Sequence, residues 1–264
     1  MENTVPNLEA LIFDVDGTLA DTEEAHRLAF NQSFKQFELN WFWSKSEYWA
    51  LLKISGGKER IKYYSLSLKE ESFVSDSLIS EIHNYKNLIY QSSLEEKKIK
   101  LRSGISQLIE DLLKNKIKIG IATSSSFNNI NKLLTICMDK YWRDAFNEIE
   151  TSDSTPTKKP DPSVYKNIIS KLNVDPRYSI AIEDTPNGLR SASCAGLRTI
   201  VTVHEMTKDL DFPEAVLVVD SVGTPQRPFK LIEGETFGFL EGSWEGESWG
   251  IFDKDSLLLV EKKI

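Results

Sequence analysis

Two aspartates, Asp14 and Asp16, directly follow a short apolar run, and a second acidic pair, Glu183 and Asp184, follows another such run. Side chains two residues apart in an extended chain face the same side, and Gly17 allows the backbone to turn directly after them. One carboxylate of such a pair can attack phosphorus, while the other protonates the leaving oxygen and later activates water. This spacing therefore favours phosphoryl-transfer chemistry, although an isolated Asp-x-Asp pair also suits a turn or a helix N-cap.

Carboxylates gathered at one edge of a sheet repel one another, which raises the pKa of some of them. A bound hard cation removes this repulsion. Oxygen ligands with no His or Cys beside them in the sequence favour Mg²⁺ over zinc or copper. We therefore predict a Mg²⁺ site among these acidic residues.

Hydroxyl groups follow a third apolar run, residues 117–122, at Thr123 and Ser124. A helical pattern begins shortly after them, so their hydroxyls and the nearby backbone N–H groups are suited to hold phosphate oxygens. Simple N-capping of that helix is the alternative, because it uses the same residue types.

Lys159, in the polar loop 151–162, supplies the positive charge that a phosphate site needs. Pro160 follows it and restricts the backbone, and so restricts where Lys159 points. The alternative is a solvated pair of lysines, Lys158 and Lys159. A lysine close to the phosphate outweighs distant acidic residues, since charges beyond the Debye length of ~8–10 Å are screened.

The elements that must position these residues are short apolar segments separated by helical patterns. Strands are predicted at 8–13, 117–122, 178–182, 198–203 and 215–219. These strands are apolar throughout, which indicates burial on both faces of a sheet. They are separated by helices along the chain, which indicates a parallel α/β sheet of right-handed βαβ units. Ligands of such sheets bind just beyond the carboxyl ends of the strands, where the polar residues above are placed.

The segment between the first two strands contains no convincing strand and carries aromatic residues at helical intervals. We predict an all-helical cap domain over 22–97, inserted into a discontinuous core of 1–21 and 98–223. Residues 224–264 are rich in Gly, Glu and aromatic residues and are predicted to form a β-rich extension packed on the core.

The four motifs together resemble the haloacid-dehalogenase-like (HAD) hydrolases over residues 8–222. Their members in this sequence are Asp14-Val15-Asp16-Gly17-Thr18, Thr123, Lys159-Pro160 and Glu183-Asp184. The resemblance implies a Rossmann-like core, a helical cap inserted after the first motif, and Mg²⁺-dependent phosphoryl transfer through an aspartyl-phosphate. It also implies a phosphatase, because true dehalogenases lack the second aspartate of the first motif.

The same resemblance implies a role for each matched residue. Asp14 is the expected nucleophile, Asp16 the general acid and base, and Thr123 with Lys159 the phosphate clamp. Mg²⁺ is expected to be bound by Asp14, the backbone carbonyl of Asp16 and Asp184, with Glu183 in or beside the coordination shell. The Arg102-Ser103-Gly104 segment departs from an Arg-Pro-Gly pattern, and we expect this to affect only the start of the next helix.

Within the family the chain is similar to β-phosphoglucomutase and the CbbY-like phosphatases, known members of which remove the 1-phosphate of xylulose-1,5-bisphosphate. The similarity lies in Asp21-Thr22-Glu23 with His26, in Ser55–Arg60, and in Glu183–Gly188. It implies a second anion site on the cap, formed by Lys58 and Arg60, although exposed charges at a helix start would show the same pattern. The substrate-binding residues expected on this basis are Glu23, His26, Lys58, Arg60, Thr123, Ser124, Lys159 and Asn187.

Two alternative functions remain open. A phosphomutase of the β-phosphoglucomutase type has the same motif residues, because retention of the aspartyl-phosphate depends on how the cap excludes water. A non-catalytic sugar-phosphate-binding protein on the same fold is the other, but intact Asp14, Asp16, Lys159 and Asp184 disfavour it.

Composition excludes several classes of protein. The 264 residues carry 32 Lys and Arg against 40 Asp and Glu, which gives a net charge of −8 and makes binding to nucleic acid or anionic membranes unfavourable. No apolar run approaches the ~20 residues that span a bilayer, and the N-terminus lacks a signal-peptide pattern. Cys137 and Cys194 are expected to be buried thiols in a reduced compartment. We therefore expect a cytoplasmic monomer that binds a small sugar phosphate or bisphosphate.

Overall fold

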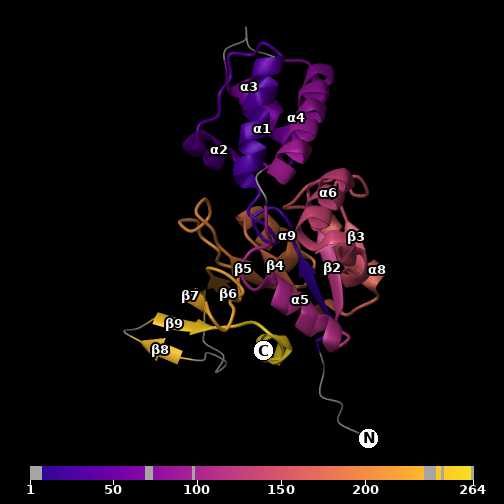
Figure 1. The fold of residues 1–264 in the computed structure, drawn as a ribbon, viewed down its shortest axis with the longest axis vertical. Coiled ribbons are helices and arrows are strands. Elements are labelled where there is room, and N and C mark those ends of the chain that lie inside the picture. Colours follow the sequence, from indigo (N-terminus) through magenta and orange to yellow (C-terminus); the bar gives the residue numbers. More distant parts are fainter. Residues whose placement is uncertain (1–7, 69–73, 97–98, 235–241, 245–246, 263–264) are drawn as a thin grey trace, which may run out of the picture.

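The strands of the described residues join into one sheet with the order β3-β2-β1-β4-β5-β6-β7-β9-β8 (Figure 1). The computed structural model describes residues 8–68, 74–96, 99–234, 242–244 and 247–262. The parallel strands are β1 (Ala10–Phe13), β2 (Lys118–Ala122), β3 (Glu148–Glu150), β4 (Ser179–Glu183), β5 (Arg198–Thr202) and β6 (Leu217–Val219). The antiparallel strands are β7 (Phe229–Gly234), β8 (Gly242–Trp244) and β9 (Glu247–Gly250). The predicted parallel α/β core is confirmed, with β3 as a strand that the sequence did not predict.

The register of the central strands explains why the polar residues converge. Phe13 of β1 lies opposite Ile121 of β2 on one side and Ile182 of β4 on the other. The chain segments that leave these three strands therefore emerge next to one another at the same edge of the sheet.

Helices cover both faces of the sheet. On one face pack α5 (Ile105–Lys114), α6 (Phe127–Met138) and α10 (Lys254–Lys262), and on the other α8 (Ser163–Leu172) and α9 (Pro186–Cys194). Alternate residues of β1 divide between the two layers: Leu11 and Phe13 join the first, Ala10 and Ile12 the second. This burial on both faces accounts for the continuous apolar pattern of the predicted strands.

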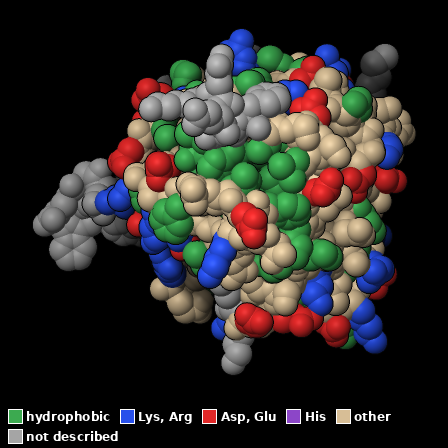
Figure 2. Space-filling model, turned by 90° about the horizontal axis from the view of Figure 1, so that it is seen from above, with side chains coloured by type: hydrophobic (Ala, Val, Ile, Leu, Met, Phe, Trp, Pro, Cys, Tyr) green, Lys and Arg blue, Asp and Glu red, His purple; other side chains and the backbone are tan. Residues whose placement is uncertain are grey.

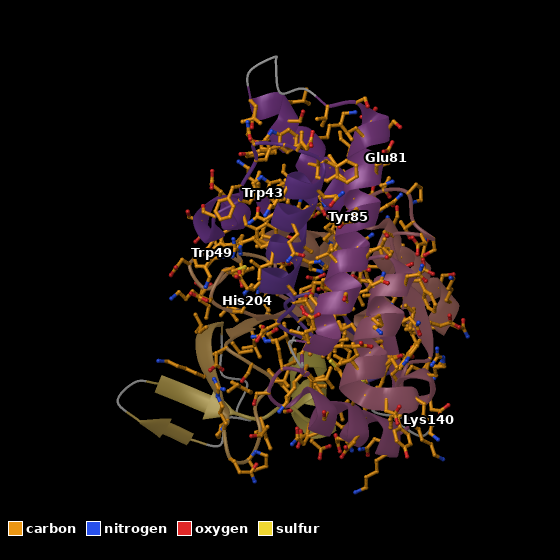
Figure 3. All side chains as sticks on the ribbon, turned by 45° about the horizontal axis from the view of Figure 1, so that its top comes forward. Trp43, Trp49, Glu81, Tyr85, Lys140 and His204 are labelled. Atoms are coloured by element: carbon orange, nitrogen blue, oxygen red, sulfur yellow. The ribbon has the colours of Figure 1, made fainter. Side chains whose placement is uncertain are left out.

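The helical cap is α1 (Glu23–Gln36), α2 (Lys45–Leu51), α3 (Gly57–Ser67) and α4 (Asp76–Glu96), which follow β1 in the chain and lie at one end of the molecule (Figure 1). Its core is aromatic and includes Trp43, labelled in Figure 3. The ring centroid of Trp43 lies 4.8 Å from those of both Phe30 and Phe34. Viewed from the cap end, hydrophobic side chains also gather across the middle of the outer surface (Figure 2). The inserted helical cap is thus confirmed, while the boundaries at 22 and 97 stay a prediction.

The C-terminal extension differs from the expected β-rich segment in one respect. The strands β8 and β9 do form a hairpin, and β7 extends the sheet beyond β6. The apolar run that begins at Leu257 is instead helical, because Leu257 and Val260, three residues apart, bury one face of α10 against the core.

Two further sequence expectations can be compared with the structure. Cys194 is exposed, contrary to the prediction of two buried thiols, because it lies at the last turn of α9; Cys137 is half-buried. Within the described part of the chain, every helix is too short or too polar to cross a membrane.

Candidate active site

Asp14 lies directly after β1, and its carboxylate is paired with Lys159. The Nζ of Lys159 donates to Asp14 Oδ1 (2.6 Å), to Glu183 Oε1 (2.6 Å) and to the backbone carbonyl of Ala122 (2.9 Å). Asp14, Glu183 and Lys159 are all buried. One ammonium group thus connects the carboxyl ends of β1, β2 and β4.

Burial leaves this cluster with unfavourable negative charge. It raises the pKa of Asp14 to about 8 in spite of the opposing charge of Lys159. It likewise raises the pKa of Asp184 to about 6, against the hydrogen bond from His204. Burial alone would lower the pKa of Lys159, but the charges of Asp14 and Glu183 raise it above its ordinary value. A further cation is the simplest way to stabilise the ionised carboxylates.

The acidic cluster fits a divalent cation. Asp14, Glu183 and Asp184 each offer an oxygen, and these atoms lie within 4.8 Å of one another. Glu183 is already bound by Lys159 and by the Tyr165 hydroxyl (2.5 Å). Asp14 and Asp184 each keep one carboxylate oxygen without a hydrogen bond to any described residue. A buried set of oxygen donors is what Mg²⁺ prefers.

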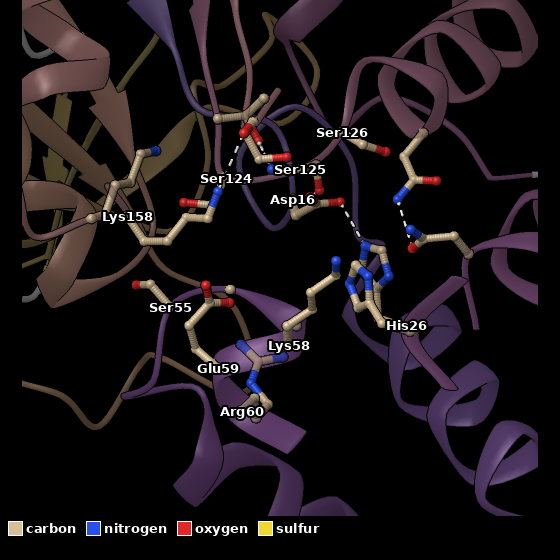
Figure 4. A pocket seen from close by; sticks show the side chains of 18 of the residues that line it. Asp16, His26, Ser55, Lys58, Glu59, Arg60, Ser124, Ser125, Ser126 and Lys158 are labelled. Carbon is tan, nitrogen blue, oxygen red and sulfur yellow. Dashed lines mark hydrogen bonds and ion pairs between the residues drawn. The ribbon is translucent and has the colours of Figure 1, made fainter. Parts of the chain in front are cut away.

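Asp16 is bound by a different set of partners. Its Oδ1 accepts from the Thr22 hydroxyl (2.5 Å). The same oxygen lies 3.1 Å from His26 Nε2, and the Ser125 hydroxyl donates to Oδ2; Figure 4 shows Asp16 between these two residues. Burial would raise the pKa of Asp16, but His26, Ser125 and Thr22 together hold it well below its usual range. Asp16 is therefore ionised in this arrangement.

Lys86, on α4, completes this network from the cap side. Its Nζ lies 2.7 Å from Nδ1 of His26, and both side chains are buried. Burial lowers the pKa of Lys86 to about 7, and burial together with Lys86 lowers the pKa of His26. The ionised Asp16 can only accept a hydrogen bond, so the hydrogen of neutral His26 resides on Nε2, and Nδ1 accepts from Lys86.

A pocket of about 530 Å³ lies between the cap and the edge of the sheet. In Figure 4 the serines Ser124, Ser125 and Ser126 of the core lie across it from Ser55 and the cap residues Lys58–Arg60. The predicted site residues that line it are Asp14, Asp16, Glu23, His26, Lys58, Arg60, Thr123, Ser124, Lys159 and Asp184. The structure therefore brings together core and cap residues that are far apart in sequence.

The two predicted cations of the cap loop differ in their surroundings. The Arg60 guanidinium donates to the carbonyls of Leu51 (3.1 Å) and Ile54 (3.2 Å) and to the Tyr48 hydroxyl (3.0 Å). Tyr48 in turn donates to Glu23 Oε2 (2.6 Å), so Arg60, Tyr48 and Glu23 are hydrogen-bonded to one another in a chain. Lys58 is exposed and has no ion pair within the described residues, which leaves its ammonium available to a ligand.

Comparison with known proteins identifies the family of this site. The family model described as haloacid dehalogenase-like hydrolase matches residues 11–202, which contain all four motifs. The chain belongs to this family. It is therefore an enzyme, a CbbY-like HAD phosphatase, as the four motifs predict.

Individual relatives agree with this assignment. The chain is 39% identical over 214 residues to protein CbbY of Cereibacter sphaeroides, which covers 81% of this chain and 92% of that protein. Its structure is similar to a CbbY mutant from Rhodobacter sphaeroides crystallised with xylulose-1,5-bisphosphate, with a TM-score of 0.77, 38% identity, and coverage of 81% and 94%. It is also similar to β-phosphoglucomutase from Clostridium difficile, with a TM-score of 0.67, 27% identity, and coverage of 81% and 91%.

Two predicted residues of the HAD site lie outside the pocket lining. Glu183 lies behind Asp14, where Lys159 and Tyr165 hold it. The side-chain amide of Asn187, at the start of α9, donates to the carbonyl of Lys53 (2.8 Å) and to the Ser55 hydroxyl (3.1 Å). Asn187 thus bonds the core to the cap loop rather than facing the pocket, because α9 begins directly beneath that loop.

Arg102 has a role that its place before α5 did not suggest, while the expectation that the departure from Arg-Pro-Gly affects only the start of that helix stays a prediction. The Arg102 guanidinium is buried and bonds the backbone after β1 to the ends of β5 and β6. The sequence could not reveal this, because its acceptors are backbone carbonyls that fold topology alone brings together.

Sequence reasoning also missed Lys86, His83 and His204. His83 lines the pocket, and burial, with the nearby charge of Lys86, lowers its pKa to about 3; His204 Nε2 lies 3.0 Å from Asp184 Oδ2. Lys86 carries a usable signal, since it falls on the buried face of α4 at the spacing of Ile82 and Tyr90. A lysine at an apolar helix position is seldom buried without a partner.

Proposed function

We propose that this phosphatase hydrolyses a sugar bisphosphate, with xylulose-1,5-bisphosphate as its substrate, through an aspartyl-phosphate on Asp14. The observation that carries the proposal is the shared pocket in which Asp14, Asp16 and Lys159 of the core face the free ammonium of Lys58 on the cap. Similarity to a CbbY protein crystallised with xylulose-1,5-bisphosphate supports the choice of substrate.

The first step is attack by Asp14. One oxygen of its carboxylate forms a bond to phosphorus while the bond from phosphorus to the sugar oxygen breaks, and the other stays available to the cation. Thr123 and Lys159, which line the pocket beside Asp14, bind phosphate oxygens and stabilise the charge of the transition state. Mg²⁺, bound by Asp14, Asp184 and the backbone carbonyl of Asp16, would supply charge neutralisation at the phosphate.

Asp16 transfers the protons. It protonates the departing sugar oxygen, and its carboxylate then removes a proton from the water that hydrolyses the aspartyl-phosphate. Because Asp16 is ionised in its network of hydrogen bonds, the proton must arrive with substrate binding, when the phosphate's negative charge raises the pKa of Asp16. His26, bonded to Asp16, keeps the carboxylate oriented toward the pocket.

The test is phosphate release from a panel of sugar mono- and bisphosphates with Mg²⁺. We expect the highest kcat/KM for xylulose-1,5-bisphosphate, and loss of activity on chelation or in Asp14→Asn. Asp16→Asn should lower kcat far more than it lowers Mg²⁺ affinity, because only its backbone is a proposed ligand. An Asp14→Asn enzyme that remains active would exclude the aspartyl-phosphate.

A phosphomutase is the second candidate, favoured by the similarity to β-phosphoglucomutase and by the closely bonded cap. Conversion of β-glucose 1-phosphate to glucose 6-phosphate without phosphate release would decide for it. A cytoplasmic location and a monomeric state stay predictions from the sequence.

A further inference from the structure

Arg102 occupies the point where three strand ends meet. Its guanidinium donates to the carbonyl of Gly17 after β1, to those of Thr202 (3.0 Å) and Val203 (2.7 Å) at the end of β5, and to that of Asp220 after β6 (2.9 Å). A further bond reaches the Thr202 hydroxyl (3.0 Å). Its side chain is 9% exposed.

Two of the carbonyls bound by Arg102 belong to the backbone segments on either side of Asp184, at Gly17 and next to His204. Gly17 packs so tightly against Asp184 that a Cβ on Gly17 would lie 2.1 Å from Asp184 Oδ2. On the other side, His204 follows Val203 and places Nε2 3.0 Å from the same oxygen. Arg102 therefore holds the two backbone segments that determine where the Asp184 carboxylate lies.

We propose that Arg102 is a positioning residue that sets the separation of Asp184 from the Asp14–Asp16 loop and thereby the divalent-cation affinity of the site. This inference rests on the metal site of the proposed function. It assigns to Arg102 an effect at the carboxylates of the site, although among the described residues its guanidinium bonds only to backbone carbonyls, Thr202 and Asp21.

The residue type matters because the acceptors are spread around the guanidinium. Arginine has five N–H donors in a planar fork, whereas lysine has three donors on one nitrogen. A lysine at this position can reach some of the carbonyls but cannot bind those of Gly17, Val203 and Asp220 at once. The remaining carbonyls would lose their hydrogen-bond partner, which releases the backbone segments that they belong to.

The C-terminal extension holds Asp220, whose carbonyl accepts from Arg102. The Asp220 N–H donates to the carbonyl of Lys230 (3.2 Å), and the Lys230 N–H donates to Asp220 Oδ1 (2.8 Å). Lys230 is part of β7, beyond the residues that the family model matches. The added strand therefore restrains the anchor of Arg102, which gives this segment a part in the geometry of the site.

The test is Mn²⁺ binding to the substrate-free, full-length enzyme, measured by electron paramagnetic resonance. We expect Arg102→Met to bind Mn²⁺ about 10- to 100-fold more weakly, the usual effect of losing a residue that orients metal ligands. The Mn²⁺ affinity of Arg102→Lys should lie between those of Arg102→Met and the wild type. If Arg102→Met does not fold, Arg102→Lys alone is compared with the wild type.

Arg27→Met is the matched control. The Arg27 side chain is also 9% exposed and donates to the carbonyl of Trp43 (2.8 Å), but it lies in the cap away from the acidic cluster. It should destabilise the protein and leave Mn²⁺ affinity unchanged. Unchanged affinity in Arg102→Lys and Arg102→Met would overturn the positioning role alone. A wild-type enzyme that binds no Mn²⁺ would overturn the proposed metal site as well.

Discussion

Lys86 Nζ lies 2.7 Å from Nδ1 of His26, between helices α4 and α1 of the cap and among aromatic rings. The ring centroids of Phe30 and Tyr90 are 4.9 Å and 5.2 Å from the ammonium, and the His26 ring stacks on Tyr90 at 3.8 Å. No carboxylate of the described residues forms an ion pair with Lys86. A lysine buried without a countercharge reduces stability, and here it donates to Nδ1 and thereby favours a hydrogen on Nε2, the nitrogen that faces Asp16.

Removal of Lys86 should reduce turnover. In Lys86→Met, the hydrogen of His26 is free to move to Nδ1, so that Asp16 loses a donor and its orientation. We expect kcat to fall about 10- to 100-fold, with a smaller change in KM. This is only part of the ~10²- to 10⁴-fold rate contribution of a general acid–base group, because Asp16 itself remains. Steady-state phosphate release measures this effect. The control is Lys62→Met, which removes an exposed cap lysine paired with Asp76 and should leave kcat unchanged.

The same substitution should increase stability near neutral pH. Burial lowers the pKa of Lys86 from 10.5 to about 7, so between these values the unfolded chain binds a proton that the folded chain does not. This group therefore makes the wild-type free energy of unfolding rise with pH between about 7 and 10.5. Urea unfolding at pH 7 and pH 9 should show a smaller rise in Lys86→Met and a higher stability at pH 7. Equal slopes in the two proteins would contradict a depressed pKa.

Gly17→Ala should remove activity as well as stability. Gly17 has a φ of 85°, and its added Cβ would collide with Asp184 Oδ2 at 2.1 Å. A misplacement near 1 Å at a reacting centre can cost about 100-fold in rate. We expect at least this loss in kcat/KM, together with a lower urea midpoint.

Gly196→Ala separates backbone strain from this collision. Gly196 has a φ of 89°, but its nearest neighbours are atoms of Pro176 at 3.6 Å. It should lose about 1–2 kcal/mol of stability, the usual cost of a left-handed non-glycine residue, and keep its kcat. If both variants kept full activity, contact between Gly17 and Asp184 would have no catalytic importance.

Lys58→Ala and Arg60→Ala should differ in substrate dependence. Lys58 is free to bind a second phosphate, so its loss should raise KM for the bisphosphate about 10-fold and have little effect on a monophosphate. Arg60 holds the cap loop through the carbonyls of Leu51 and Ile54, so Arg60→Ala should impair both substrates. Kinetics with xylulose-1,5-bisphosphate and xylulose 5-phosphate distinguish the two. Identical effects of both variants would mean that Lys58 does not contact the second phosphate.

The local sequence is enough to predict the position of much of the core half of this site. Asp14 and Thr123 directly follow apolar runs whose types and lengths specify buried strands, and strand ends at one edge of a parallel sheet must lie together. Their grouping in one pocket follows from a few neighbouring residues and from the handedness of βαβ units. The grouping of these carboxylates, hydroxyls and Lys159 at one edge of the sheet could therefore be predicted from the amino-acid sequence, and their catalytic roles stay predictions.

The tertiary structure decided which partner each polar group has. The sequence places Asn187 beside the acidic motif and Lys58 beside Arg60, but their directions depend on how the cap packs over α9. Arg102 is bound by carbonyls more than 80 residues away in sequence, and Lys86 meets His26 only because α4 packs on α1. The sequence does not show which groups will form such long-range hydrogen bonds, because almost every residue offers the same backbone carbonyl and many residues offer an amine. The sequence therefore determined the chemistry at the strand ends, and only the packed structure determined how that chemistry is oriented.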